Sequence, residues 1–347
     1  MSLDNKRDVN TTDKKPNILL VVLLSLLSVA LVALVIFILL DKKEPGQDVT
    51  EQSTETEYLE KWEEGTITYK GKSYVYNSDL DIYLLMGIDK EGPVEVAEDY
   101  VSGGQSDALF LFVMDRETEE VSVISINRNT MTRVETYLAN GTNAGYTEAQ
   151  ICVQHGFGDG RRVSCGLTEK AVAHLFYNIP IDGYLSINVG AVSTLNDSIG
   201  GVEVTVLNDL VYPEKNVVLT KDQTVTLTGE QAYVYLRGRD TDEFDSATLR
   251  LRRQEQYITA YLEKVEKMIS TSSSQLVSIY EELSPYIVTN IEVVSLLEEI
   301  TSYNYSSERM YTVPGETVMG KEFEEFHVDE DALYDLIINV FYEEVTK

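Results

Sequence analysis

DALFLFVMDRETEEVSVISINR, residues 107–128, decides the fold, because it contains two buried-strand patterns joined by a charged turn. The runs 107–114 and 121–126 are short and rich in Leu, Phe, Val and Ile, as buried β-strands are. The intervening residues 115–120 are almost all charged, which favours a solvent-exposed turn. A similar apolar run at 81–88 precedes the pair. The sequence therefore predicts a β-hairpin that follows a neighbouring strand.

Helical patterns surround these strands on both sides in the sequence. The longest, 246–269, places Ile258, Leu262 and Val265 on one stripe, as an amphipathic helix does. Strands mixed with helices predict an α/β domain with helices on both faces of a sheet. Because no internal repeat and no second linker interrupts the pattern, we expect one domain over residues 65–347. The other expected helices are 168–178, 228–236, 273–285, 291–303 and 329–344, and further strands are expected at 183–189 and 202–207.

The N-terminal segment has the composition of a membrane anchor. Residues 17–40 are almost wholly Leu, Val, Ile and Ala without charge, which is long enough for one transmembrane helix. No small-residue cleavage site is evident, so we expect an uncleaved anchor. Residues 1–16 carry Lys and Arg and are expected to form a cytoplasmic tail. Residues 41–64 are expected to be an acidic linker. With the tail in the cytoplasm, the domain at 65–347 would lie on the other side of the cell membrane.

The chain is strongly acidic, with a formal net charge of −30 and a pI of about 4.4. This charge repels nucleic acid, so no nucleic-acid partner is expected. The sequence lacks HExxH and CxxC patterns, which argues against a zinc site. It also lacks a Walker A loop, which argues against a nucleotide ligand.

Three charged residues stand at the ends of the first three strands. Asp89 follows the first strand, Asp107 begins the second, and Arg128 follows the third. If the strands are antiparallel neighbours, these residues meet at one edge of the sheet, where ligands of α/β folds often bind. Two adjacent carboxylates favour a hard cation such as Mg²⁺, which also bridges to phosphate. The alternative is that both aspartates cap turns.

A second cluster consists of arginines. Residues 235–256 read YLRGRDTDEFDSATLRLRRQEQ, and no lysine occurs between Lys221 and Lys264. The planar guanidinium group grips phosphate oxygens with paired hydrogen bonds, so the cluster is a candidate phosphate site. The alternative is a salt-bridged helix neutralised by the neighbouring acidic residues. Helical spacing places Arg250, Arg253 and Gln254 on one face and Arg252 on another; Arg237 and Arg239 precede the helix.

Cys152 and Cys165 are the only cysteines of the chain. In an exported domain two nearby cysteines favour a disulfide, which here would close a glycine-rich segment at 156–160. The alternative is two buried free thiols. We expect the disulfide.

Several segments together resemble the LytR-CpsA-Psr family. The resemblance rests on six sequence segments, three at the start of the domain and three later in the chain, and covers about residues 78–345. It implies a three-layer α/β/α domain with a mixed central sheet, outside the membrane. It further implies a phosphotransferase that moves a glycopolymer phosphate from a polyprenyl-pyrophosphate carrier to peptidoglycan. The matching segments are DIYLLMGID (81–89), QSDALFLFVMD (105–115), VSVISINRNTM (121–131), IPIDGYLSINVGAVSTLNDSIGGVEV (179–204), LTGEQAYVYLRGR (227–239) and RLRRQEQYI (250–258).

The resemblance also implies roles for single residues. Asp89 and Asp107 match the metal-linked aspartates, with Mg²⁺ as the cofactor. Asp107 and Arg128 match catalytic positions of the family. The matching pyrophosphate-binding set consists of Arg128, Arg237, Arg239, Arg250, Arg253 and Gln254.

Three residues depart from the family pattern. Gln105 stands where many members have arginine, whereas Asn129 and Ala247 each stand where aspartate is common. The departures remove one positive and two negative groups and leave the metal aspartates and the arginines. Two functions therefore remain open from the sequence: an active Mg²⁺-dependent phosphotransferase, or a non-catalytic binder of the lipid carrier that acts as an envelope scaffold.

Overall fold

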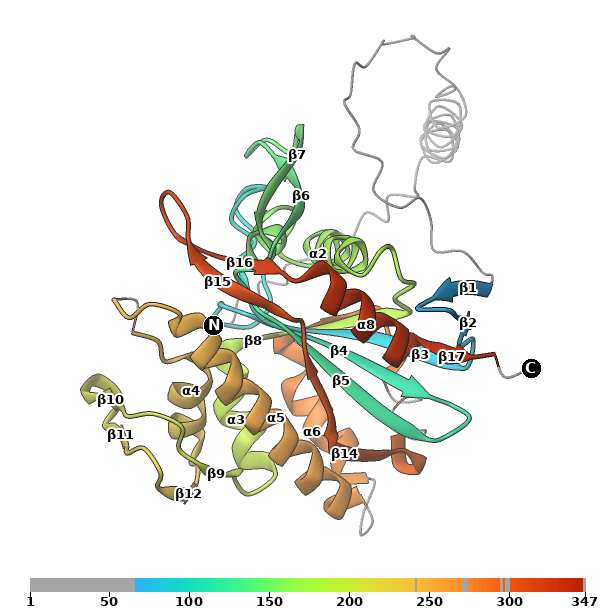
Figure 1. The fold of residues 1–347 in the computed structure, drawn as a ribbon. Coiled ribbons are helices and arrows are strands. Elements are labelled where there is room, and N and C mark those ends of the chain that lie inside the picture. The colour runs from blue at the N-terminus through green and yellow to red at the C-terminus, as the bar shows by residue number, and fades with distance from the viewer. Residues whose placement is uncertain (1–65, 241, 270–273, 294–295, 297–299, 346–347) are drawn as a thin grey trace, which may run out of the picture. The chain divides into compact units, whose positions relative to one another are not determined.

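A computed structural model describes residues 66–240, 242–269, 274–293, 296 and 300–345 (Figure 1). The expected tail at 1–16, membrane helix at 17–40 and linker at 41–64 lie outside the described residues. No helix within the described ranges has the length and apolarity needed to cross a bilayer.

A six-stranded mixed sheet forms the centre of the described domain, in the order β13-β8-β3-β4-β5-β14 (Figure 1). The predicted hairpin is confirmed, because β4 and β5 are antiparallel and Asp115 pairs with Glu120 at its turn. Strand β3 is antiparallel to β4 and parallel to β8. The strand bounds are Leu80–Ile88 for β3, Ser106–Asp115 for β4, Glu120–Ile126 for β5, Gly183–Asn188 for β8, Ile287–Thr289 for β13 and Asn304–Thr312 for β14.

Helices cover both faces of this sheet and complete the expected three layers (Figure 1). On one face, α2 (Arg162–Leu175) and α8 (Glu330–Phe341) pack against every second side chain of β3. On the other face, α5 (Ser246–Ile269) packs against Phe110 and Val123 through Leu251. Burial of each such large apolar side chain contributes about 1.5–3 kcal/mol to the stability of the fold.

A separate apolar cluster packs three helices against one another. It joins α3 (Val192–Ser198), α4 (Gly229–Arg237) and α5, with Tyr235 and Tyr257 among its buried members. Thr228 begins α4 through a capping box: its hydroxyl accepts from the Gln231 backbone while the Gln231 side chain accepts from the Thr228 backbone. These contacts satisfy orphan N–H groups of the helix start and hold α4 in place.

Small sheets and short helices surround these layers. A three-stranded sheet joins β1 (Thr66–Tyr69), β2 (Lys72–Tyr76) and β17 (Tyr342–Glu344). Four two-stranded pairs are β6 (Met131–Tyr137) with β7 (Asn143–Gln150), β9 (Glu203–Thr205) with β12 (Thr224–Thr226), β10 (Leu210–Tyr212) with β11 (Val217–Leu219), and β15 (Gly315–Met319) with β16 (Glu324–Val328). Other helices of the described ranges are α6 (Ser274–Leu283) and the 3-10 turns η1 (Ile151–Gly156), η2 (Val189–Ala191), η3 (Pro213–Lys215), η4 (Ser284–Tyr286) and η5 (Ile300–Ser302).

Helix α2 begins earlier than the sequence pattern predicts. It starts at Arg162, and Thr168 lies inside it, where its hydroxyl donates to the carbonyl of Ser164. The carboxylate of Asp159 accepts from the backbone of Arg161 and Val163 and so acts as the cap. The predicted N-cap at Thr168 is therefore wrong, because the helix begins at Arg162 and the Asp159 carboxylate accepts from backbone N–H groups at that start.

Candidate functional site

Asp107 owes its position to a bulge in the sheet. Gly87 pairs with Ala108 but Ile88 pairs with Ser106, so Asp107 is an extra residue on β4. Simple alternation would place Asp107 on the same face as the buried Leu109, inside the apolar core under α2 and α8. The bulge redirects the carboxylate to the opposite face, where a charge has partners.

Two arginines hold the Asp107 carboxylate. Arg250 Nη1 donates to Oδ2 at 2.9 Å, and Arg128 Nε approaches Oδ1 at 2.8 Å. The second contact is an ion pair without hydrogen-bond geometry, since neither of its atoms has a hydrogen-bond partner within the described part of the chain. Asp107 is thus fixed between two guanidinium groups, one from α5 and one from the loop that follows β5.

Asp89 follows β3 and reaches the same site. Its Oδ1 accepts a hydrogen bond from the backbone of Gln105 at 2.7 Å. Gly104 makes this approach possible, because its φ is +87° and an added Cβ would lie 2.9 Å from the Asp89 carboxylate. The loop before β4 therefore orients Asp89 with a backbone donor.

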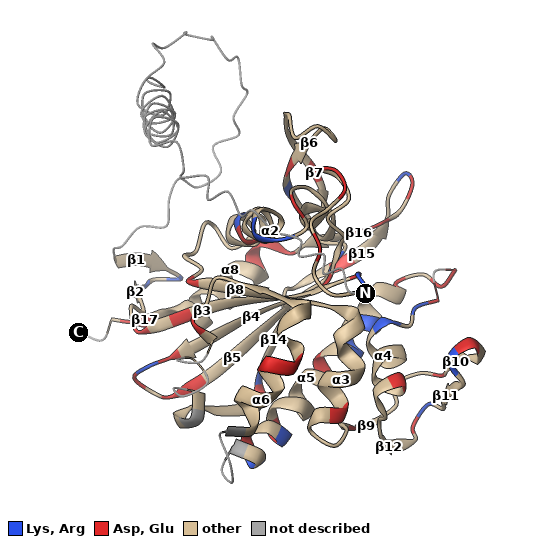
Figure 2. Cartoon of the chain, turned by 180° about the vertical axis from the view of Figure 1, so that it is seen from behind, with Lys and Arg blue, Asp and Glu red and all other residues tan. Residues whose placement is uncertain are grey.

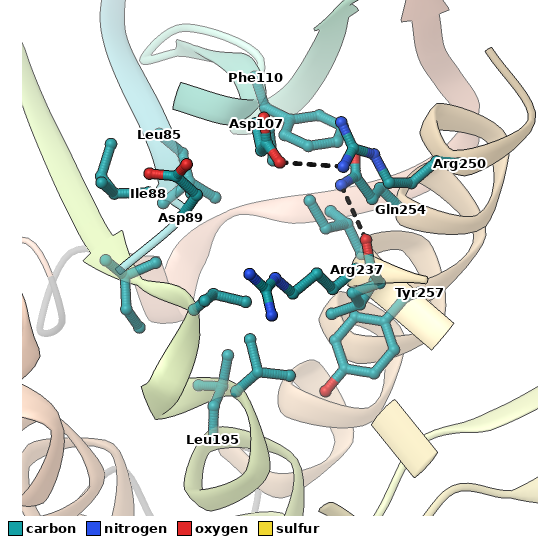
Figure 3. A pocket seen from close by; sticks show the side chains of 17 residues that line it. Leu85, Ile88, Asp89, Asp107, Phe110, Leu195, Arg237, Arg250, Gln254 and Tyr257 are labelled. Carbon is teal, nitrogen blue, oxygen red and sulfur yellow. Dashed lines mark hydrogen bonds and ion pairs between the residues drawn. The ribbon is translucent and has the colours of Figure 1, made fainter. Parts of the chain in front are cut away.

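An apolar pocket, the first pocket, lies beside these carboxylates between the sheet and α3, α4 and α5 (Figure 3). Its empty volume is about 750 Å³ including the mouth. In Figure 3, Asp89, Asp107 and Arg250 lie along one side, Arg237 between, and Leu195 and Tyr257 opposite. An apolar cavity with charged groups at one side fits an amphiphilic ligand with an anionic head. The lining residues are Leu85, Gly87, Ile88, Asp89, Asp107, Ala108, Phe110, Ile187, Val189, Val192, Leu195, Leu236, Arg237, Arg250, Gln254, Tyr257 and Ile258.

The residues predicted to share one arginine-bearing face of α5 separate into two groups, one at the first pocket and one in the protein interior. Arg250 and Gln254 line the first pocket, and Gln254 Nε2 donates to the carbonyl of Leu236 at 3.1 Å. Arg252 is exposed, as predicted. Arg253 does not line the pocket: it is buried, donates to the carbonyl of Gly238 and lies over the Tyr235 ring. Burial lowers the pKa of Arg253 to about 10. Arg253 thus supports the end of α4 from inside the protein, outside the lining of the first pocket.

Arg237 and Arg239 have acidic partners that sequence reasoning missed. Arg237 Nη1 donates to Glu91 Oε1 at 2.9 Å, and Tyr233 contacts both groups. Arg239 Nη2 donates to Glu324 Oε2 at 3.3 Å. No local signal marks these partners, because each lies far away in the sequence and is brought in by the packing of the chain. Acidic residues occur on many of the described elements (Figure 2). Residue type alone therefore does not show which of them pair with these arginines; their position in the fold does.

Two of the three departures from the family pattern surround Arg128. The Gln105 side-chain oxygen accepts from Arg128 Nη2, and Asn129 Oδ1 accepts from Nη1 at 3.5 Å. Two neutral amides therefore contact the guanidinium group of Arg128. Ala247 is buried near the start of α5.

The two cysteines are free thiols, so the predicted disulfide is wrong. Cys152 lies within 4.0 Å of Gln105 Oε1, whereas Cys165 contacts Ser186 Oγ at 3.3 Å and His155 Nε2 at 3.7 Å. The two sulfur atoms point to different partners on different elements, and both are buried. Burial raises the pKa of Cys152 to about 11 and that of Cys165 to about 12, which keeps both thiols protonated.

The residues present fit a magnesium ion bound together with a phosphate ligand. Asp89 and Asp107 line the same pocket. Mg²⁺ is usually held by one or two carboxylates plus substrate phosphates rather than by a full protein cage. Within the described residues, no group of three or more His, Cys, Asp or Glu side chains is arranged to hold a metal.

Fold and site together define an α/β/α domain with an apolar ligand pocket that ends in a mixed arginine and aspartate cluster. The chain belongs to the LytR-CpsA-Psr family, whose sequence profile matches residues 46–337.

Curated relatives of the chain share a common name. The polyisoprenyl-teichoic acid–peptidoglycan teichoic acid transferase TagT of Bacillus subtilis is 28% identical over 204 residues, 57% of this chain and 57% of that protein. The transferase TagU of Bacillus mycoides is 30% identical over 190 residues, 55% of this chain and 54% of that protein. The chain spans little more than half the length of the curated relatives it matches.

Solved structures share the fold. The protein gbs0355 of Streptococcus agalactiae superimposes with a TM-score of 0.61 at 22% identity, covering 76% of this chain and 87% of that one. TagV of Bacillus subtilis gives a TM-score of 0.57 at 23% identity, covering 76% of this chain and 96% of that one.

Proposed function

We propose that this protein transfers a glycopolymer phosphate from a polyprenyl-pyrophosphate carrier to peptidoglycan. The observation that carries the proposal is the first pocket, in which an apolar cavity meets Asp89, Asp107 and Arg250 at one side and Arg237 reaches between. A polyprenyl pyrophosphate has the matching division between an apolar chain and an anionic head. The names of the curated relatives, which are teichoic acid transferases, support the same reaction class.

In this proposal the apolar lining holds the polyprenyl chain, and Arg237, Arg250 and Gln254 hold the pyrophosphate. Arg237 is free to exchange partners, because its ion pair with Glu91 is exposed on both sides and such pairs contribute only about 0–1 kcal/mol. The Arg250–Asp107 pair is more buried and keeps both side chains oriented. Preorganised charges of this kind stabilise a phosphoryl-transfer transition state without rearrangement.

Asp89 and Asp107 are the proposed ligands of Mg²⁺. When bound, the ion supplies positive charge that offsets the charge of the pyrophosphate leaving group. Arg128 orients Asp107 through their ion pair and adds positive charge at the same edge of the sheet. The group that accepts the proton of the acceptor hydroxyl is left unassigned.

The location belongs to the same proposal. We infer that residues 17–40 anchor the protein in the cell membrane and that the domain lies on the extracytoplasmic side, where peptidoglycan is assembled. The apolar composition of 17–40 and the basic residues before it support this arrangement.

A second function is favoured by the contacts of Arg128. Gln105 and Asn129, both neutral, replace charged family residues in direct contact with this guanidinium group. A site altered in this way fits a non-catalytic carrier binder that serves as an envelope scaffold.

Turnover of a polyprenyl-pyrophosphate-linked glycan, with and without Mg²⁺, distinguishes the two functions. Under the transferase proposal the wild type consumes the lipid only with Mg²⁺, and Asp107→Ala abolishes turnover while the protein stays folded. Lipid binding without any turnover in the wild type would establish the scaffold instead. If the wild type binds no lipid pyrophosphate, both functions fail.

A further inference from the structure

Asp89 owes its orientation to a short loop segment, residues 103–105, which directly precedes β4. Two hydrogen bonds join this segment to Asp89. The Gln105 backbone donates to Asp89 Oδ1 at 2.7 Å, and the Asp89 backbone donates to the Gln105 carbonyl at 3.1 Å. A displacement of the 103–105 segment therefore moves the Asp89 carboxylate or deprives it of its backbone donor.

His155, in η1, holds the 103–105 segment from the interior of the protein. Its Nδ1 lies 3.1 Å from the Gly104 carbonyl oxygen. Because a carbonyl group only accepts hydrogen bonds, Nδ1 carries the hydrogen and donates it. The next residue of η1 adds a second contact, since the Gly103 backbone donates to the Gly156 carbonyl at 2.9 Å. The segment is thus bound to η1 at two successive residues.

The imidazole ring of His155 is itself held in place by buried polar groups. The side chain is 1% exposed. Its Nε2 lies 3.7 Å from Cys165 Sγ on α2, and this sulfur lies 3.3 Å from Ser186 Oγ on β8. A buried row of polar contacts therefore runs from the central sheet through α2 and His155 to the segment that orients Asp89.

The 103–105 segment and η1 are packed too closely for the segment to shift toward η1. A Cβ atom added to Gly103 would lie 2.5 Å from the His155 carbonyl oxygen and 3.2 Å from that of Gly156. His155 is not among the residues that line the first pocket. It therefore acts on the site through the loop segment and not by contact with a ligand there.

We propose that His155 is a positioning residue of the metal site, which holds the 103–105 segment so that the Gln105 backbone orients the Asp89 carboxylate. The inference rests on the proposed function, in which Asp89 binds Mg²⁺. Replacement of a residue that holds a metal ligand in place commonly lowers metal affinity about 10- to 100-fold. His155 thus contributes to metal affinity without contact to the ion.

Two replacements of His155 separate positioning from the filling of space. In His155→Asn the side-chain amide nitrogen takes the place of Nδ1 and retains a donor for the Gly104 carbonyl. In His155→Gln the longer side chain carries its amide toward the place of Nε2, so this donor is lost. A role in filling space favours glutamine, which is the larger side chain, whereas positioning favours asparagine.

A second variant disturbs the same contact without changing His155. Gly103→Ala introduces the Cβ atom that would lie 2.5 Å from the His155 carbonyl oxygen and so pushes the segment away from η1. Gly92→Ala is the matched control, because Gly92 lies in the same loop and an added Cβ there has no atom within 4 Å. Thermal unfolding checks that each variant of the detergent-extracted full chain is folded.

Mn²⁺ serves as the probe for the metal site, because electron paramagnetic resonance measures the free ion directly. We expect His155→Gln and Gly103→Ala to bind Mn²⁺ about tenfold more weakly than the wild type. His155→Asn and Gly92→Ala should bind it within about twofold of the wild type. The inference is overturned if His155→Asn loses as much affinity as His155→Gln, or if Gly103→Ala binds as tightly as Gly92→Ala.

Hydrogen–deuterium exchange at the Gln105 amide measures the position of the segment without any metal. We expect this amide to exchange faster in His155→Gln than in the wild type and to stay protected in His155→Asn. If the wild type binds no Mn²⁺, the metal part of the proposed function fails, and the exchange measurement still tests the hold of His155 on the segment. Unchanged exchange in His155→Gln would overturn the positioning role itself.

Discussion

At the scale of the single residue, Arg250 shows how the site keeps charge available inside the protein. The side chain is buried, and burial lowers its pKa, while Asp107 opposes that effect. Its Nη2 is buried without a hydrogen-bond partner within the described ranges. An unsatisfied buried donor costs about 1–3 kcal/mol, so Arg250 retains a donor and a charge that an anionic ligand compensates.

We predict that Arg250→Lys weakens binding of farnesyl diphosphate by roughly ten- to a hundredfold. A lysine offers a single point charge in place of the planar fork, and each lost charge-assisted hydrogen bond is worth about 1.5–3 kcal/mol. Arg252→Lys is the control, because Arg252 lies on the same helix but is exposed. Calorimetric titration of both variants measures the effect. Equal losses in the two variants would contradict the assignment of Arg250 to the site.

The cysteines make a second prediction at this scale. Both thiols are buried, and burial raises the pKa of Cys152 to about 11, so neither is expected to react with iodoacetamide in the folded protein at neutral pH. Denatured without reductant, the chain should take up label at both Cys152 and Cys165. Mass spectrometry counts the labels, and a denatured chain without label would show that Cys152 and Cys165 do form a disulfide.

At the scale of the element, the β15–β16 hairpin connects separate parts of the site. Glu324 Oε1 accepts from the backbone of Asp245, and its Oε2 accepts from Arg239. The Gln150 side chain donates to the Glu324 carbonyl at 2.7 Å, and Phe326 donates through its backbone to Asn129 at 2.9 Å. The hairpin therefore places a carboxylate where it partly neutralises the arginine cluster.

We expect Glu324→Gln to tighten the binding of inorganic pyrophosphate by a few fold, because Arg239 loses its competing anion. The amide retains the shape of the side chain and an acceptor for the Asp245 backbone, so the fold should persist. Glu325→Gln is the control, since Glu325 instead pairs with His327 at 2.9 Å. Titration at low ionic strength measures the change, and weaker binding in Glu324→Gln would contradict a competing role for this carboxylate.

At the scale of the whole molecule, stability should depend on the protonation of His155. This residue is buried, Nδ1 contacts the Gly104 carbonyl at 3.1 Å, and burial lowers its pKa below the ordinary value of 6.5. The folded protein therefore keeps His155 neutral, whereas the unfolded chain binds a proton as pH falls below about 6.5. The stabilisation is fully present above that pH and is lost below it.

We predict that the free energy of unfolding falls below about pH 6.5, with a slope of at most about 1.4 kcal/mol per pH unit from His155. His155→Gln should remove this contribution, and His327→Gln, at an exposed position, should leave it unchanged. Urea unfolding followed by near-UV circular dichroism at several pH values measures the slopes. Identical slopes in His155→Gln and the wild type would show that His155 does not carry the effect.

The proposed topology is also a property of the whole chain. Protease added to intact wall-less cells should remove the domain at 65–347 and spare the N-terminal tail at 1–16. In the proposed topology, the uncharged run 17–40 has the length of a bilayer core and would hold the tail on the cytoplasmic side. Immunoblotting against tags at the two ends reads out the result. A protected domain would contradict both the topology and the proposed function.

The sequence by itself determined the central hairpin, the longest helix and the family. The β4–β5 hairpin and helix α5 match their predicted ranges within one residue, because strand and helix patterns depend on neighbours a few positions away. The same local patterns identified Asp89, Asp107, Arg237, Arg250 and Gln254, all of which line the first pocket.

Only the tertiary structure decided how these side chains are used. A bulge, which the sequence of β4 does not reveal, turned Asp107 out of the core, and packing placed Arg253 against Gly238 outside the first pocket. The partners of the arginines are separated from them by 143 residues for Arg250–Asp107, 146 for Arg237–Glu91 and 85 for Arg239–Glu324. Contacts over such separations depend on the register of the sheet and the packing of helices, which no local pattern encodes. The free thiols follow the same rule, because α2 and η1 orient the two sulfur atoms toward different neighbours.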